Sequence, residues 1–327
     1  MLSKETLNEI ISDGNILGQK CIVRDGFVFT SITEPHNVFD AIVIRNPYNI
    51  PCFFPRFPNS MHSLEEHIHL VNELQLEKAV ILGTDIYFLT ECPSLKYLSI
   101  LPADSTGNGF DFSPLYHMPE INQLHCCTEY GESNQYIGYV DYSQISGLKK
   151  LSVSGKGHLN FNKVDSLQRL GVSYHKGKNA DLTDLIGSEQ LEELRMIQCS
   201  NTSLAGIELS KSIRSVELSY NRALSDISHL ARVRHTLRKL SIQNCPKISD
   251  FTCLSELRNL EYLQLLGKNI LPSLSFLNNL PCMKQFEFSM DVADGDLSPC
   301  LRIQYVRSHK DRKHYSHKNS ELPKNTL

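Results

Sequence analysis

The 327-residue sequence lacks any run of about 18 apolar residues, so we expect no membrane-spanning helix. Its first twenty residues lack a basic start followed by a long apolar stretch, and we expect no secretory signal. The phosphate-binding patterns G-x-x-x-x-G-K-[ST] and G-x-G-x-x-G and the nucleophile pattern G-x-S-x-G are also missing. Because these patterns are missing, nothing in the sequence indicates an enzyme, and we expect neither catalytic activity nor a cofactor.

Metal-ligand spacing is missing as well. The clustered histidines, in residues 62–69 and 309–317, have no cysteine pattern beside them, and HExxH does not occur. We therefore expect no metal site. The ten cysteines could indicate a secreted disulfide framework, but Cys126, Cys199 and Cys245 occupy regular repeat positions, where a free thiol acts as a small apolar group. The sequence favours reduced thiols and a cytoplasmic location.

What the sequence does contain is an apolar frame, L-x-x-L-x-L, that returns about every 23 residues. Chance alternation in a chain with 41% hydrophobic residues could give two or three such frames, but not nine or ten at a near-constant spacing. A further frame can be placed at Phe39. The regular frames begin at Leu76, Leu95, Ile121, Leu148, Leu167, Leu191, Ile213, Leu237, Leu260 and Met283.

Each repeat predicts a strand, a turn and a helical return. Counted from the first residue of a frame, positions 4 and 6 are apolar and alternate with polar residues, which is typical of a strand with one buried face. In three consecutive repeats, those that begin at Ile213, Leu237 and Leu260, apolar residues at positions 12, 15, 18 and 21 recur every third residue, which suits a 3₁₀ or short helical segment. One repeat cannot bury its apolar edge alone, so we predict nine or ten parallel strands, stacked repeat on repeat.

Position 9 of three consecutive repeats is Cys199, Asn221 and Cys245, side chains that can satisfy buried backbone groups where a coil turns. With the L-x-x-L-x-L frame and the S-D-[I/F] that follows, the chain resembles leucine-rich repeat proteins. It is closest to the short-repeat class of internalins and of a regulatory subunit of eukaryotic phosphatase. The resemblance implies a curved, horseshoe-like solenoid with a parallel β-sheet on its concave face and short helical returns on its convex face. In most members it also implies protein binding.

The two ends differ from the repeats and suggest caps. We predict an N-terminal cap over residues 1–75, about nine or ten repeats over 76–290, and a C-terminal cap with a basic tail over 291–327. Within the first cap we predict a helix at 2–11, a strand at 39–44, a proline- and aromatic-rich loop at 47–58 and a helix at 63–74. That loop either packs over the first coil or exposes aromatic side chains to a partner.

Residues 301–327 carry seven Lys and Arg against two Asp and Glu, whereas the whole chain has a net charge of −3. This basic segment is either a solvated end, lying against the acidic body of its own chain, or a nucleic-acid contact. We expect the former, because no run of basic residues with interleaved aromatics supports nucleic-acid binding.

Strand positions 3, 5 and 7 should face outward on the concave side. The cations Lys150, Arg169 and Arg195 come together there, and either Glu193 and Glu217 or an acidic partner would offset their repulsion. An ordinary solvated sheet face is the alternative. The candidate partner-binding residues are Tyr97, Lys150, Arg169, Arg195, Glu217, Lys239, Tyr262 and Gln264.

The hypothesis that follows is a non-catalytic, protein-binding repeat protein, expected to be monomeric, cytoplasmic and bacterial. By analogy of family and architecture, such a protein could serve as an inhibitor or immunity partner of a toxin. Two alternatives stay open: an effector or surface protein that binds host proteins, and a regulatory subunit of an enzyme such as a phosphatase. The partner is expected to be another protein, with no membrane and no nucleic acid involved.

Overall fold

The computed structural model describes residues 10–11, 21–32, 39–46, 57, 60–102, 110–118, 120–128 and 138–325. They fall into two compact units, an N-terminal unit of residues 1–159 and a C-terminal unit of residues 160–327. The boundary lies inside the run of repeats. In the described part of the chain, no helix combines the length and apolar character needed to cross a membrane.

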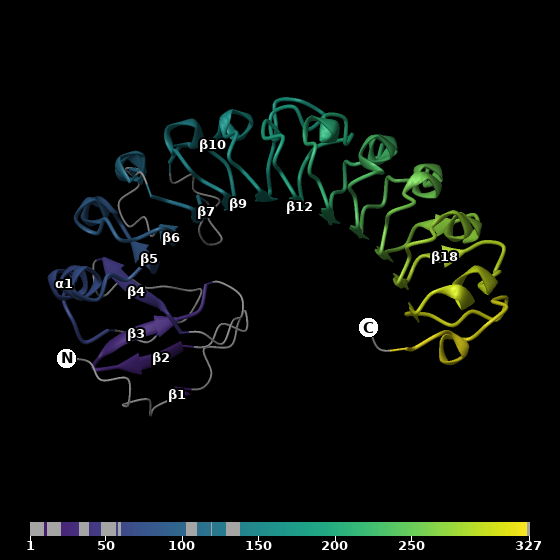
Figure 1. The fold of residues 1–327 in the computed structure, drawn as a ribbon, viewed down its shortest axis with the longest axis horizontal. Helices are drawn as coiled ribbons and strands as arrows, with labels where there is room; N and C mark the ends of the chain where they lie inside the picture. The colour runs from purple at the N-terminus through teal and green to yellow at the C-terminus, as the bar shows by residue number, and fades with distance from the viewer. Residues whose placement is uncertain are drawn as a thin grey trace. The chain divides into compact units, whose positions relative to one another are not determined.

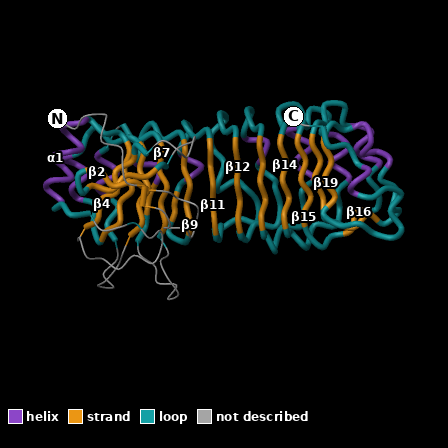
Figure 2. The backbone as a smooth tube through the Cα atoms, turned by 90° about the horizontal axis from the view of Figure 1, so that it is seen from below, coloured by secondary structure: helices purple, strands orange, loops and turns teal. Residues whose placement is uncertain are grey.

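The C-terminal unit is a stack of parallel strands. The strands follow one another in chain order within one sheet. Each strand residue lies opposite the residue at the same repeat position on the neighbouring strand. The strands line the concave side of this unit and the 3₁₀ helices its convex side (Figure 1), and Figure 2 shows the strands side by side. The ladder is β11 (Arg169–Ser173), β12 (Glu193–Ile197), β13 (Ser215–Ser219), β14 (Lys239–Gln243), β15 (Tyr262–Leu266), β17 (Gln285–Phe288) and β19 (Tyr305–Ser308).

Short elements complete each coil of this unit. The 3₁₀ helices are η4 (Phe161–Lys163), η5 (Ile207–Leu209), η6 (Ser228–Val233), η7 (Thr252–Glu256), η8 (Ser275–Asn279), η9 (Ser298–Arg302) and η10 (Asn319–Glu321). A small second ladder pairs β16 (Ile270–Leu271) with β18 (Asp291–Val292). The apolar residues at positions 4 and 6 of the predicted frames in this unit are buried, and so are those at positions 12, 15 and 18 of the three repeats that begin at Ile213, Leu237 and Leu260, which confirms the repeat frame read from the sequence.

The N-terminal unit begins with antiparallel strands and continues with parallel ones. The antiparallel part is β1 (Ile10–Ile11), β2 (Cys21–Arg24) and β3 (Phe27–Thr30), and β3 pairs antiparallel with β4 (Ala41–Asn46). From β4 onward the ladder is parallel, through β5 (Lys78–Gly83), β6 (Tyr97–Pro102), β7 (Gln123–Cys127) and β9 (Lys150–Ser154). Its remaining elements are α1 (Leu64–Leu74), η1 (Tyr87–Glu91), η2 (Ser113–His117), η3 (Tyr142–Gln144) and the paired strands β8 (Val140–Asp141) and β10 (His158–Leu159).

Several expectations fall near the N-terminus. Helix α1 lies where the sequence predicts a helix, and Ser63 caps it through a capping box with Glu66. Of the helix predicted over residues 2–11, residues 2–9 lie outside the described residues, whereas Ile10–Ile11 form a strand. The loop at 47–58 lies outside the described residues except for Phe57, which is buried at 6% exposure.

The described residues contain more parallel strands than the nine or ten that the frames predict. Strand β19 was missed because its frame ends at Ser308 and lacks an apolar sixth residue. The Ser308 side chain is nevertheless buried, and its hydroxyl donates to the carbonyl of Lys310 at 2.7 Å. A hydroxyl with an internal partner can thus replace an apolar side chain at this position.

The C-terminal segment covers the open edge of β19. Val306 donates its N–H to the carbonyl of Pro323 at 2.9 Å, and Lys324 pairs antiparallel with Tyr305. The Arg312 guanidinium binds both carboxylate oxygens of Asp291, at 2.8 and 3.0 Å. The basic segment therefore packs against its own body, and the last strand does not present a free edge.

Gly187 marks a close approach of two coils in the C-terminal unit. A Cβ built there would lie 1.9 Å from the backbone oxygen of Asn162, so the coils would have to separate. We expect Gly187→Ala to lower the free energy of unfolding by about 1–3 kcal/mol in urea denaturation. Glu189→Ala, an exposed control two residues away, should cost under about 0.5 kcal/mol. Equal unfolding midpoints would show that the coils tolerate the methyl group.

Candidate protein-binding surface

The two arginines that the sequence analysis places on the concave face of the C-terminal unit already have partners. Arg169 Nη2 lies 3.2 Å from Glu193 Oε1, and Arg195 Nε lies 3.1 Å from Glu217 Oε1, each pair joining neighbouring strands. This confirms internal compensation, the first of the two explanations that the sequence allows. Because all four side chains are more than a third exposed, each pair contributes at most about 1 kcal/mol. These arginines do not require an acidic partner.

A chain of hydrogen bonds runs across three later strands. Ser241 Oγ donates to Gln264 Oε1 at 2.8 Å, and Gln264 Nε2 donates to Glu287 Oε2 at 3.2 Å. Gln285 also donates to Glu287, at 3.0 Å, and His309 Nε2 lies 3.7 Å from the same carboxylate. Gln264 therefore uses both ends of its amide inside the sheet, and its side chain is held in one orientation.

Lys239 and Tyr262 are directly opposite each other on β14 and β15. Lys239 is exposed and Tyr262 half-buried, and burial raises the pKa of the Tyr262 phenol, which keeps it neutral. Neither side chain makes a hydrogen bond or ion pair within the described residues. Among the sequence-predicted residues of this unit, these two are the ones whose polar groups are available to a partner.

The remaining candidates, Tyr97 and Lys150, belong to the N-terminal unit. Tyr97 lies on β6, and Lys78 Nζ is 5.6 Å from the centre of its ring while pairing with Asp40 at 2.5 Å. Lys150 lies half-buried on β9, in register with Gln123. Lys150 is therefore in a different unit from Arg169 and Arg195, which lie on adjacent strands.

The outward face of the first parallel strands is not open. Outward residues of β4 and β5 join β2, β3 and Phe57 in an apolar cluster, and Leu101 of β6 packs against it. The buried members of this cluster are Cys21, Val28, Val43, Phe57, Val80 and Leu82. The expectation that strand position 7 faces solvent is therefore wrong for Leu101, which is partly buried against this cluster, because the N-terminal segment covers the first parallel strands.

Burial keeps the thiols of the repeats protonated. Burial raises the pKa of Cys199 to about 11, and it raises the pKa of the fully buried Cys126 further still. Neither is a thiolate at neutral pH, so neither has the reactivity of a nucleophile. Nine cysteines in the described residues are free thiols. In the same part of the chain, no three His, Cys, Asp or Glu side chains gather as metal ligands would.

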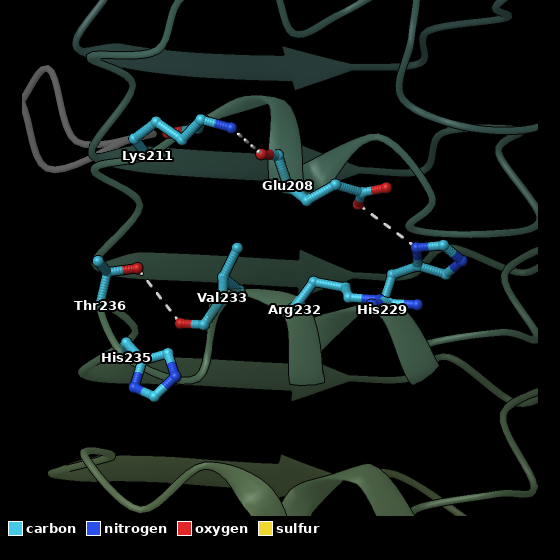
Figure 3. Close-up of a pocket in the computed structure, with 8 residues that line it drawn as sticks. Glu208, Lys211, His229, Arg232, Val233, His235 and Thr236 are labelled. Atoms are coloured by element: carbon cyan, nitrogen blue, oxygen red, sulfur yellow. Dashed lines mark hydrogen bonds and ion pairs between the residues drawn. The ribbon is translucent and has the colours of Figure 1, made fainter.

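A hollow of about 490 Å³ lies beside η5 and η6 (Figure 3). Two of its charged or titratable side chains bind within the hollow: Lys211 Nζ donates to the carbonyl of Glu208 at 3.3 Å, and His229 Nδ1 lies 3.3 Å from Glu208 Oε2. Arg232 extends towards His229, whereas Lys211 and His235 lie on the other side of the hollow. These groups do not converge on one point, so the hollow has no arrangement for general acid–base or nucleophilic chemistry.

The chain has the leucine-rich repeat fold, in the form found in internalins. No family model and no curated protein matches the sequence. Among solved structures, an internalin (inlF) from Listeria monocytogenes is similar, with a TM-score of 0.54 and 17% identity over 79% of this chain and 76% of that one. InlJ from the same species gives a TM-score of 0.43 and 14% identity, covering 69% of this chain and 61% of its own. A leucine-rich repeat protein of Leptospira interrogans also gives 0.43 and 14%, with coverages of 66% and 61%.

The sequence analysis does not predict two exposed tyrosines at the ends of strands in the C-terminal unit. Tyr174 and Tyr220 follow β11 and β13 in left-handed backbone conformation, with φ of 59° and 57°, and both side chains are exposed. The positive φ could have been predicted from the later repeats. Their equivalent residues are Asn244 and Gly267, and asparagine and glycine favour this conformation.

Proposed function

We propose that the protein is a non-catalytic binding protein that recognises another protein through the concave face of its C-terminal unit. The observation that carries this proposal is the pair Lys239 and Tyr262. Both are mounted on adjacent strands of a rigid sheet, and neither is engaged internally, whereas the arginines and Gln264 around them are. A tyrosine beside a cation on a rigid scaffold is a typical source of binding energy.

The setting that we propose is the bacterial cytoplasm, where the protein acts as an inhibitor or immunity partner of a toxin. Free, mostly buried thiols in the described residues support a reducing compartment. The similarity to an internalin from a bacterium supports a bacterial source. The inhibitory role follows by analogy of architecture. A host-binding effector or surface protein and a regulatory enzyme subunit are the other outcomes of the test.

The test is co-expression with the product of the adjacent gene, followed by light scattering of the purified complex and growth assays. We expect a stable complex and relief of that product's toxicity. Tyr262→Ala and Lys239→Ala should each weaken binding by about 1–2 kcal/mol, because both remove contacts from the centre of the face. Lys163→Ala, an exposed lysine on η4, is the matched control and should bind like the wild type.

A complex that forms without relief of toxicity would favour a regulatory subunit. Capture of a host protein in place of the neighbouring product would favour an effector. Wild-type affinity in both the Tyr262 and Lys239 variants would contradict the assignment of the concave face.

A further inference from the structure

The carboxyl ends of the strands in the C-terminal unit share one backbone device. The residue at position 8 of five consecutive repeats has positive φ. In the first four it donates its N–H to a carbonyl of the next repeat, as Tyr174 does to Ile197 at 2.9 Å and Tyr220 to Gln243 at 2.8 Å, whereas Gly267 donates to Ser289 Oγ at 3.0 Å. The φ values are 59° at Tyr174, 53° at Gln198, 57° at Tyr220, 51° at Asn244 and 150° at Gly267. The turn therefore requires the left-handed region whatever residue occupies it.

Two of these residues are poor choices for that conformation. A tyrosine in the left-handed region places its Cβ against the following carbonyl, a cost that glycine avoids and asparagine reduces. Tyr174 and Tyr220 are 49% and 44% exposed, and neither hydroxyl makes a hydrogen bond in the described residues. Half-buried Ile197 lies on the strand between them. About half of each side chain stays exposed to solvent, and a strained backbone that presents an aromatic ring to solvent points to a function.

Cations gather in the same turns. Five exposed basic side chains occupy these turns, and none makes an ion pair in the described residues. They are Lys176, Lys178, Arg222, Lys247 and Lys268.

The aspartates of these coils are occupied by capping. Asp226 accepts from Ser203 Oγ and from the N–H of Ser228, and Asp250 accepts from the N–H of Thr252. These hydrogen bonds hold the pKa of both carboxyls below the usual range, so they stay ionised. These aspartates are therefore used within their own coils, and the five cations are exposed to solvent.

We propose that this carboxyl edge, meaning Tyr174, Ile197, Tyr220 and the five cations, binds an acidic segment of a partner protein. The proposal rests on the proposed function, because it names the kind of partner that a binding repeat protein would take. Charge complementarity and two solvent-facing aromatic rings at the end of a rigid sheet favour this occupant.

The spacing sets the length of the segment. Neighbouring coils are about 4.8 Å apart, so the two tyrosines lie about 10 Å apart and the cations span about 19 Å. An extended chain covers that distance with about six residues. The same coils also carry ionised aspartates such as Asp226 and Asp250, which disfavour a polyanion with a charge on every nucleotide more than a peptide whose acidic residues are interrupted by apolar ones.

The probe is a fluorescein-labelled peptide, Gly-Glu-Phe-Glu-Asp-Leu-Glu-Gly, titrated with the full chain and followed by fluorescence anisotropy. We expect a Kd on the order of 100 µM at low salt and at least about five-fold weaker binding in 0.5 M NaCl. The same peptide with Gln and Asn in place of its acidic residues should not bind. No binding of the acidic peptide up to 1 mM would overturn the proposal, as would tighter binding of a twelve-nucleotide oligo(U) at this edge.

Two variants locate the site. Replacing Lys176, Arg222 and Lys247 together by Ser should weaken the peptide at least about ten-fold, whereas Lys163, Lys211 and Arg258 replaced by Ser form a control with the same change of charge. Tyr220→Asn should weaken binding about five-fold and raise the Tm by about 2 °C or more, because asparagine suits the left-handed backbone. Equal losses in the two triple variants, or unchanged affinity in Tyr220→Asn, would overturn the proposal.

The Tyr262→Ala variant separates this inference from the proposed function. It should bind the peptide normally even where it weakens the partner complex. If Tyr262→Ala loses the peptide and the edge variant keeps it, the concave face takes acidic segments, so the carboxyl-edge assignment fails while the proposed function stands.

Discussion

Leu240→Ala is expected to lower the free energy of unfolding by about 2–5 kcal/mol. Leu240 is at position 4 of its repeat with 0% exposure, and it is in register with Val216 on one neighbouring strand and Leu263 on the other. Truncation would leave a cavity between coils that the parallel ladder holds at a fixed separation. Since each coil of a solenoid is stabilised only by its neighbours, the loss also weakens both interfaces of that coil.

Urea denaturation followed by circular dichroism measures this loss. Lys239→Ala is the matched control, because it changes the adjacent residue on the same strand and its side chain is exposed. It should cost under about 0.5 kcal/mol. Equal unfolding midpoints for the two variants would contradict the assignment of Leu240 to the inward face.

The repeat frame could be predicted from sequence because it depends on local, repeated chemistry. Positions 4 and 6 alternate with the period of a strand, and the caps of the returns are read directly from motifs such as Ser225-Asp226, where Asp226 accepts from the N–H of Ser228. The parallel pairing of β12 with β13 confirms the stacking that the frame predicts. Burial at 1% or less of Leu194, Val216 and Leu240 confirms the register.

The N-terminal segment and the backbone conformation after the strands could not be predicted from the sequence, because neither follows from the repeat pattern. The N-terminal segment covers β4 and β5 through antiparallel strands that share no motif with the repeats, and only the apolar residues Val43, Val80 and Leu82 at outward positions hinted at it. The sequence does predict the glutamate partners of Arg169 and Arg195. It does not predict the positive φ at Tyr174 and Tyr220, since aromatic residues disfavour that backbone conformation. Departures from local preference of this kind concentrate at functional surfaces.

Asn221 satisfies two buried backbone groups that would otherwise have no partner. Its Oδ1 accepts from the N–H of Cys199 at 2.8 Å, and its Nδ2 donates to the carbonyl of Met196 at 2.9 Å. The side chain is 1% exposed, so water cannot replace it. The same position in adjacent repeats is Cys199 and Cys245, whose thiols donate to the carbonyls of Val172 and Leu218 at 3.5 and 3.7 Å.

Asn221→Ala is therefore expected to cost about 2–4 kcal/mol in urea denaturation, because each orphaned buried group costs about 1–3 kcal/mol. Asn221→Cys is the matched variant. Its thiol can donate weakly to a carbonyl, as in the neighbouring repeats, but cannot replace the bond to the Cys199 N–H, so it should lose about half as much. Hydrogen exchange of the Cys199 amide should accelerate in both variants. If the two variants are equally destabilised and that amide exchanges at the wild-type rate, lost side-chain volume explains the effect, and the hydrogen bonds of Asn221 do not.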